Sequence, residues 1–276
     1  MRYIFIALIL SAWLTAVHAQ DRVFAYTYQS NVLNTGSVDF EFQNTLRTGK
    51  VGPYSPYIYG QHLDQRLELE VGLGGKVQTA FYINSELFHY ADTSSDGMNQ
   101  DLKISFSNEW KWKISDPVAN AVGTGLYGEI EAGGSNIELE GKLIFDKQFP
   151  HDLVALNIAG KYELEREISR VDKVTKATWV YNSPIELYLG YMHFFSHTIG
   201  LGLEARNNND ITQKNGWMNS VFFAGPVFHV SIDNFMINFS SLPQIVNLHK
   251  TKAAPGSRDL DGFEAAEIRL LVGYSF

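Results

Sequence analysis

Cysteine is absent from the 276-residue chain, and this absence excludes several classes of protein. A chain without cysteine has no disulfide framework, no zinc–thiolate centre and no thiol nucleophile. It is also not a bacterial lipoprotein, because no thiol is available for acylation. An exported protein without disulfides needs another source of stability, and a closed, hydrogen-bonded β-barrel in lipid is one.

Long apolar runs are also absent, apart from one short stretch at the start of the chain. Arg2, the apolar residues 3–13 and the small residues of 17–19 follow one another in the order of a secretory signal. The apolar run is too short for a membrane-spanning helix, which needs about 20 residues. We therefore predict a signal peptide over residues 1–19, cleaved after Ala19, with a retained N-terminal anchor as the alternative.

Basic residues are scarce. The formal net charge is −8, and loss of Arg2 with the signal would leave 21 Lys and Arg against 30 Asp and Glu. Nucleic acid is therefore not an expected partner, because phosphate binding requires a basic face. The mean hydropathy of −0.13 is low for a helical membrane protein, but it suits a barrel in which lipid-facing and lumen-facing residues cancel in the mean.

What the chain does contain is alternation with a period of two, the pattern of a strand with two different faces. Leu67, Leu69 and Val71, for example, alternate with Glu68 and Glu70. Within such runs the apolar phase carries no charged residue, while the opposite phase carries many. The pattern recurs over residues 38–43, 66–73, 77–83, 102–114, 122–131, 137–145, 154–165, 185–191, 199–206, 235–239 and 268–276.

Short and long connections alternate along the chain, as expected when one end of a barrel faces the periplasm and the other faces outward. The short turns fall near 74–75, 115–120, 146–151, 195–197 and 233–234. The longer loops fall near 48–61, 90–101, 167–176, 207–216 and 242–262, with 133–136 as a short member of that group. The prediction is an all-β fold, a transmembrane up-and-down antiparallel β-barrel of about 12 strands over residues 37–276, with both termini periplasmic.

Two features fit this barrel less simply. Residues 20–36 could lengthen the first strand, tuck into the lumen or form a periplasmic lead-in. Pro184 and Pro226 each remove a donor from the strand ladder, and Phe222-Phe223 blurs the alternation nearby. Since a closed barrel has no edge to hold a proline, we expect local bulges at both prolines.

The C-terminal residues carry a family resemblance. Leu270, Val272, Tyr274 and Phe276 alternate and end in an aromatic residue, and this resembles the C-terminal assembly signal of Gram-negative outer-membrane β-barrel proteins. The resemblance implies a multi-pass protein of the bacterial outer membrane. Its implied partners are outer-membrane lipid and the barrel-assembly machinery, which would recognise the last strand.

A looser resemblance covers the mature chain. Residues 26–29 and 63–73 look like segments of uncharacterised porin-like barrels, some of which are grouped with putative transporters of phenol-degradation operons. That grouping implies transport of small solutes by association alone. It transfers no binding residue to this chain.

The phase opposite the apolar one should line the lumen. Its members include both signs of charge, with a surplus of carboxylates that favours cations or neutral solutes over anions. The candidate lumen-lining residues are Glu41, Arg66, Glu68, Glu70, Lys103, Glu129, Glu131, Glu138, Glu140, Lys142, Glu163, Glu204 and Arg269.

Three functions remain open at this stage. The first is a passive porin for small neutral or cationic solutes with an acidic lumen. The second is a non-conducting structural or interaction barrel that displays its outer loops. The third is an outer-membrane lipid hydrolase.

Enzymatic chemistry finds little support. Paired carboxylates such as Glu138 and Glu140 recur along the chain, which is typical of lumen patterning rather than of one acid–base pair. A hydrolase would use the strand-associated histidines His193, His197 and His229 with Ser196 or Ser231, but no G-x-S-x-G motif occurs. We predict that the protein is not an enzyme and has no catalytic residues.

Cofactor and metal motifs are equally scarce. The histidines are scattered, and none fits an H-x-x-x-H helix motif, because His193 and His197, which have that spacing, fall at a predicted turn. The aspartates near 92–101 and 259–261 lack the spacing of a calcium loop, so solvated loops are the favoured interpretation. We predict no cofactor and no metal site.

Overall fold

The computed structural model describes residues 22–50, 60–91, 98–171, 174–252 and 254–276. The predicted signal peptide lies outside the described residues. In the described part of the chain, no helix is long and apolar enough to cross a membrane.

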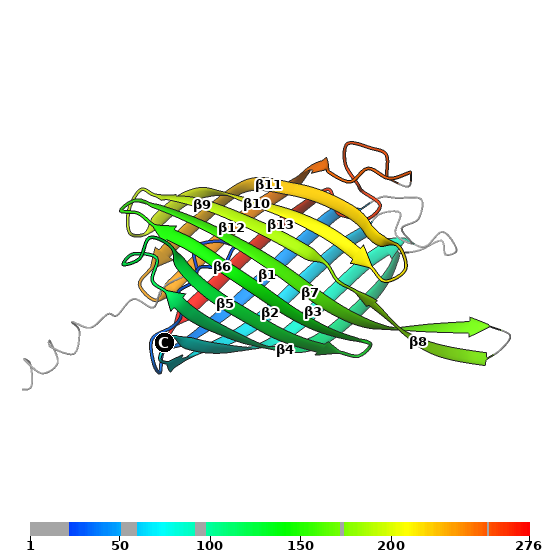
Figure 1. Cartoon of the computed structure of the whole chain (residues 1–276), viewed down its shortest axis with the longest axis horizontal. Helices are drawn as coiled ribbons and strands as arrows, with labels where there is room; N and C mark the ends of the chain where they lie inside the picture. Colours follow the sequence, from blue (N-terminus) through cyan, green and yellow to red (C-terminus); the bar gives the residue numbers. More distant parts are fainter. Residues whose placement is uncertain (1–21, 51–59, 92–97, 172–173, 253) are drawn as a thin grey trace, which may run out of the picture.

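In the described residues, thirteen strands form one continuous antiparallel sheet, shown in Figure 1. Apart from β8 and β9, which do not pair with each other, each strand pairs with its neighbours in chain order, and β13 returns to pair with β1, so the sheet closes on itself. The strands are β1 (Val38–Lys50), β2 (Gly60–Gly74), β3 (Val77–Ala91), β4 (Met98–Ser115), β5 (Gly123–Gly133), β6 (Asn136–Gln148), β7 (Asp152–Val171), β8 (Val174–Asn182), β9 (Ile185–Phe194), β10 (Ile199–Thr212), β11 (Gly216–Ile232), β12 (Phe235–Asn247) and β13 (Ala266–Ser275).

Twelve strand positions surround the barrel, and β8 is the extra strand. β7 pairs with β9 over residues 152–160 and with β8 over residues 163–171, so β8 continues β9 toward the long-loop end. The interruption between them is Ser183-Pro184, and the pairing with β7 keeps the same register on both sides, so the strand is interrupted there without the bulge that was predicted. Figure 1 shows the β7–β8 hairpin extending well beyond the other strands. The predicted all-β barrel of about 12 strands is therefore confirmed.

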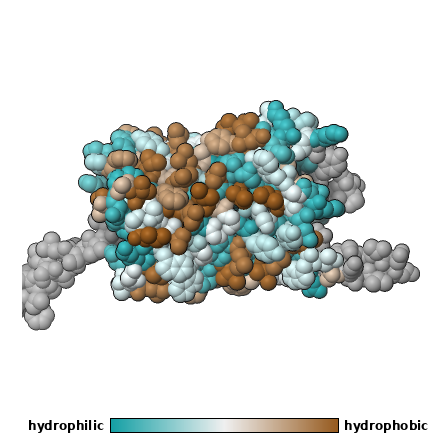
Figure 2. Space-filling view, in the orientation of Figure 1, coloured by the Kyte–Doolittle hydropathy of each residue, from teal (hydrophilic) through white to brown (hydrophobic). Residues whose placement is uncertain are grey.

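The two faces of the wall differ as the alternation predicts. Leu67 and Leu69 are 41% and 42% exposed, whereas Glu68 between them is 0% exposed. Figure 2 shows apolar side chains spread across the outer wall, with hydrophilic residues densest toward its two ends. So large an apolar surface is stable in contact with hydrocarbon and not in contact with water.

The short turns gather at one end of the barrel together with the C-terminus. Phe276 donates its backbone N–H to Val38, and Gly36 donates to Gly72 beside the β2–β3 turn. That turn is tight because Gly74, Gly75 and Lys76 all have positive φ (94°, 62° and 87°). We call this the short-turn end and the opposite one the long-loop end.

The predictions of two long loops are wrong. β7 runs on to Val171 and β8 starts at Val174, and β10 runs on to Thr212 before β11 starts at Gly216. The predicted loops at 167–176 and 207–216 are therefore mostly strand. At the end of β10, residues 207–210 are all polar, so the two faces no longer differ and polarity does not distinguish this strand from a loop.

The bulge expected at Pro226 of β11 lies instead at Phe222 and Phe223. The pairing of β11 with β12 shifts register between Phe222 and Phe223 and resumes at Val227, beyond Pro226. Phe223 and Val227 are fully buried and point into the barrel. The alternation is blurred here because the inner face of β11 is apolar rather than charged.

The inner face of β11 is apolar because something packs against it. Residues 22–33, which we call the plug, lie inside the barrel in a non-strand conformation, and Phe24, Ala25 and Ser30 have no exposed surface. The first strand begins only at Val38. Of the placements left open for residues 20–36, this part of the segment therefore neither lengthens β1 nor lies outside the barrel; it is tucked into the lumen.

Candidate functional site: the lumen and its plug

A cavity of about 380 Å³ lies inside the barrel. We call it the vestibule. It reaches toward the long-loop end, where Glu131 and Glu138 flank the β5–β6 connection, and the plug residues Arg22, Tyr26 and Tyr28 border it from the other side. Eight of the predicted lumen residues line it: Arg66, Glu129, Glu131, Glu138, Glu140, Lys142, Glu163 and Arg269.

The other five predicted lumen residues lie apart from the vestibule lining. Glu41 and Glu70 border a smaller cavity of about 30 Å³, which is separated from the vestibule by the plug. Glu68 and Glu204 are almost fully buried. Lys103 is exposed near the long-loop end, with its ammonium 5.1 Å from the centre of the Phe88 ring.

Glu204 is the main electrostatic tether of the plug. Its carboxylate accepts three consecutive backbone N–H groups, from Ala25 at 3.1 Å, Tyr26 at 3.0 Å and Thr27 at 2.9 Å. Hydrogen bonds to a charged acceptor are stronger than neutral ones. The predicted lumen residue therefore binds the plug rather than presenting a free charge to the lumen.

Neutral lumen side chains satisfy much of the remaining plug backbone. The amide of Asn157 accepts the N–H of Tyr28 at 2.6 Å and donates to its carbonyl at 2.9 Å, as a neighbouring strand would do. Gln78 accepts the N–H of Leu33, and Arg269 donates to the carbonyl of Ala25. An irregular segment in a membrane-embedded barrel needs such partners, because no lipid group can replace them.

The apolar side of the plug packs on small wall residues. Phe24 lies against Gly190 of β9 so closely that a Cβ on that glycine would stand 2.7 Å from the phenyl ring. Ala155 and Met192 complete this contact. Two residues farther along the plug, Tyr26 packs with Ala159 of β7 and Phe223 of β11. Most of the apolar core thus lies between the plug and the wall of β7, β9 and β11, and a smaller cluster joins Tyr28 to Tyr127 and Ile144.

Tyrosines and charged groups form a network beside the plug. The Arg66 guanidinium lies 4.2 Å from the centre of the Tyr82 ring and pairs with Glu129. Tyr127 also donates to Glu129. The Lys142 ammonium lies 4.4 Å from the Tyr28 ring and 4.1 Å from the Tyr127 ring. Such cation–π contacts stabilise a buried ammonium without adding a negative charge.

Most basic groups of the vestibule are neutralised by pairing. Lys142 pairs with Glu140 and Lys161 with Glu138, each at 3.1 Å. On the opposite wall Arg206 pairs with Glu267, a carboxylate that the sequence interpretation did not single out. Several acidic groups, in contrast, have no ion pair within 4.0 Å among the described residues; these are Glu86, Glu131, Glu163 and Asp210.

The side chains considered for hydrolysis serve the structure of the short-turn end. Ser196 accepts the backbone N–H groups of Thr198 and Ile199. His193 pairs with Asp152 at 2.9 Å. His229 contacts Asn238, whose amide also donates to the carbonyl of Arg22. The contacts of Ser196 and His193 stabilise turns, and the contact of His229 with Asn238 helps to hold the plug.

The loop aspartates likewise have a structural role where they are described. Asp259 is 2% exposed and accepts the backbone N–H groups of Asp261 and Gly262. Asp92 and Asp96 lie outside the described residues. The loop is therefore folded inward at Asp259, which differs from the expected solvated loop.

The C-terminal residues are placed for contact with the membrane. Leu270 and Phe276 are exposed on the outer face. The Tyr274 ring lies between those of Phe235 and Phe276, at centroid distances of 4.7 and 4.9 Å. This aromatic row stands at the short-turn end, as interfacial rings do in membrane barrels.

Solved structures with the same fold are outer-membrane barrels. The COG4313 outer membrane channel from Pseudomonas putida F1 shares 9% identity with a TM-score of 0.58, over 90% of this chain and 98% of that one. The NanC porin shares 7% identity with a TM-score of 0.51, over 85% and 98% of the two chains. The translocator domain of the autotransporter NalP from Neisseria meningitidis shares 12% identity with a TM-score of 0.53, over 100% and 96%.

At these identities the likeness establishes the fold. Together with the apolar outer wall, it places the chain in the bacterial outer membrane as a multi-pass barrel. No curated protein matches the chain at a significant level. One family does match: the profile described as "Family of unknown function (DUF6662)" covers residues 16–276, and the chain therefore belongs to that family.

Proposed function

We propose that the protein is a passive channel for small cations and neutral solutes, and that the plug sets its width. The supporting observation is the vestibule, which is lined by ten Asp and Glu against seven Lys and Arg. A water-accessible cavity inside a barrel, with a surplus of one sign of charge, raises the local concentration of the opposite ion.

The charge surplus is greatest where a solute would enter. Glu131, Glu163 and Asp210 line the vestibule toward the long-loop end, without ion pairs among the described residues. The basic groups closer to the plug are paired or stacked on tyrosine rings. Small cations are therefore favoured at the entrance and meet polar groups of alternating charge farther in.

The plug would leave only a narrow path for solutes through the barrel. It separates the vestibule from the cavity bordered by Glu41 and Glu70, and Arg22 and Tyr28 belong to both linings. Large solutes would have to displace the segment held by Glu204 and Asn157. The dense bonding of the plug also supports a second candidate, a non-conducting barrel that acts through its outer loops.

The proposal also includes the orientation of the barrel in the membrane. We place the short-turn end and both termini in the periplasm, because bacterial barrels have short periplasmic turns and longer outer loops. The vestibule then opens to the outside, where solutes arrive.

Conductance in planar bilayers tests the proposal. Purified protein should give small single-channel steps in potassium chloride, with a reversal potential that indicates cation preference. A plug-releasing variant, Glu204→Gln, should give larger steps. Absence of steps in both proteins would contradict the channel and support the non-conducting barrel, while steps with anion preference would contradict the assigned selectivity.

A further inference from the structure

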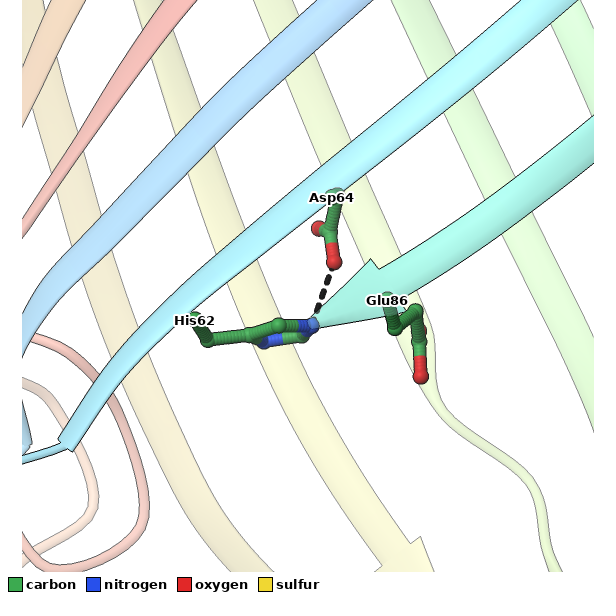
Figure 3. Close-up of side chains that lie close together, drawn as sticks. All are labelled: His62, Asp64 and Glu86. Atoms are coloured by element: carbon green, nitrogen blue, oxygen red, sulfur yellow. Dashed lines mark ion pairs between the residues drawn. The ribbon is translucent and has the colours of Figure 1, made fainter. Parts of the chain in front are cut away.

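Three potential metal ligands converge on the inner wall near the long-loop end. His62 and Asp64 are two positions apart on β2 and so face the same side, and Glu86 of β3 stands directly opposite Asp64. One nitrogen or oxygen from each side chain lies within 4.8 Å of the other two. Figure 3 shows the three side-chain ends close together, two from β2 and one from β3.

Two of the three ligands, Asp64 and His62, are oriented by a neighbour outside the cluster. Arg47 pairs with Oδ2 of Asp64 at 2.8 Å, which leaves Oδ1 directed to Nε2 of His62 at 2.5 Å. The His62 ring is stacked on Phe88, with 4.1 Å between centroids and an interplanar angle of 18°. Orientation of ligands by outer partners is characteristic of metal sites in proteins.

The contact between His62 and Asp64 needs a bridging proton or metal ion. Nε2 and Oδ1 have almost no exposed surface, and neither makes a hydrogen bond of acceptable geometry. Two atoms with lone pairs that lie 2.5 Å apart and away from water repel each other unless a proton or a metal ion bridges them. Glu86 adds a second carboxylate directly across from Asp64, and like charges in opposed positions destabilise a sheet.

From this geometry we infer a binding site for one divalent transition-metal ion, held by His62 Nε2, Asp64 Oδ1 and the Glu86 carboxylate. An imidazole nitrogen with two carboxylate oxygens suits Zn²⁺ better than Ca²⁺ or Mg²⁺, which prefer oxygen ligands alone. Ligand distances of about 2.0–2.2 Å require only small movements of the three side-chain ends. Arg47 retains its bond to Oδ2 and continues to orient Asp64.

An ion can reach the site from inside the barrel. Asp64 and Glu86 line the vestibule, and His62 lines an adjoining cavity of about 300 Å³ that also includes His89 and Glu264. The cluster stands where these two cavities meet. The inferred site therefore concerns binding and does not depend on whether the barrel conducts.

Zinc binding to the purified, untagged protein tests the inference. Equilibrium dialysis against Zn²⁺ should show one ion per chain, and His62→Ala, Asp64→Asn and Glu86→Gln should each weaken binding at least tenfold. His249→Ala, at the same end of the barrel, and Glu138→Gln, in the vestibule, are matched controls that should retain wild-type binding. X-ray absorption of the zinc complex should show a single imidazole in the ligand shell.

Two outcomes would overturn the inference. The first is that wild-type protein binds no more zinc than His62→Ala, and the second is that the two control variants lose binding to the same degree as the cluster variants. Heat-modifiable gel mobility verifies that each variant forms the barrel. Where His62→Ala fails to fold, His62→Asn and Glu86→Gln provide the same comparison.

Discussion

Glu204 and Tyr26 lie 178 positions apart in the chain, and the carboxylate of Glu204 accepts the backbone N–H of Tyr26 at 3.0 Å. The same carboxylate also accepts the N–H groups of Ala25 and Thr27. One side chain of β10 thus holds three consecutive residues of the plug. Its replacement is the most direct test of what the plug does.

Glu204→Gln should loosen the plug without opening the barrel wall. The substitution keeps the shape of the side chain but removes its charge, and hydrogen bonds to a charged group contribute about 1.5–3 kcal/mol each. We expect plug release to become on the order of 100-fold more frequent. Larger conductance steps and new tryptic cleavage after Arg22 would report it.

Glu163→Gln serves as the control for this prediction. Glu163 lines the vestibule, and no hydrogen bond or ion pair links it to the plug among the described residues. Tryptic cleavage after Arg22 should therefore stay at the wild-type level. Equal cleavage in the two variants would show that Glu204 does not tether the plug.

Gly190→Ala should displace Phe24. The added Cβ would stand 2.7 Å from the phenyl ring, and overpacking of this kind costs about 1–3 kcal/mol. We expect faster tryptic cleavage after Arg22 and larger conductance steps. Gly160→Ala is the matched control, because a Cβ at Gly160 meets nothing within 4 Å; an identical response from both variants would contradict the packing argument.

Neutralising Glu131, Glu163 and Asp210 should abolish the cation preference. The triple variant Glu131→Gln, Glu163→Gln, Asp210→Asn leaves seven acidic and seven basic residues around the vestibule, instead of ten and seven. The reversal potential in a potassium chloride gradient should move toward that of a non-selective pore. Lys161→Gln should move it in the opposite direction, and an unchanged potential in both variants would show that the vestibule charge does not select ions.

Asp116 should titrate at unusually low pH. The Lys113 ammonium at 2.6 Å and the N–H groups of Ala119 and Val118 stabilise the carboxylate and lower the pKa of Asp116 to about 2. A lowered pKa in the folded state means that the turn gains stability above the usual pKa of 3.8 and loses it as the pH falls through about 2.

Amide exchange in the β4–β5 turn measures this effect. Protection of Val118 and Ala119 should persist at pH 3 and decline near pH 2. Asp116→Asn should lose part of that protection at both pH values. Loss of protection in the wild type at pH 4 would contradict the prediction.

Phe276→Ala should impair assembly rather than stability. We propose that the exposed C-terminal aromatic is read by the barrel-assembly machinery, as its resemblance to the assembly signal implies. The amount of heat-modifiable barrel in the outer membrane should fall severalfold, while refolding in detergent should be nearly unchanged. Leu248→Ala, an exposed apolar residue at the opposite end, is the control and should leave membrane levels intact.

The barrel wall could be predicted residue by residue because a membrane strand has a local signature. Lipid admits only apolar side chains and the lumen accepts charged ones, so neighbours such as Leu67 and Glu68 report the two faces directly. The signature fails where both faces are polar, as at the long-loop end of β10. It also fails where the inner face is apolar, as at Phe223.

The partners of the lumen residues could not be predicted in the same way. Alternation places Glu204 and Glu131 on the same face, yet one is bound to three backbone N–H groups and the other has no ion pair among the described residues. Their difference depends on where residues 22–33 pass through the barrel. The proposed metal ligands escape sequence motifs for a related reason, since Glu86 meets His62 and Asp64 only across a strand pair.

The order of residues by itself determined the strand period and the number of strands around the wall, and it predicts an export signal and an acidic lumen. Each of these follows from contacts that a side chain makes with bulk lipid or bulk water. Only the closed barrel decided which carboxylates remain unpaired, where the plug lies and which histidine meets two acids. Those features depend on groups brought together across the lumen, and their distances are set by closure of the sheet.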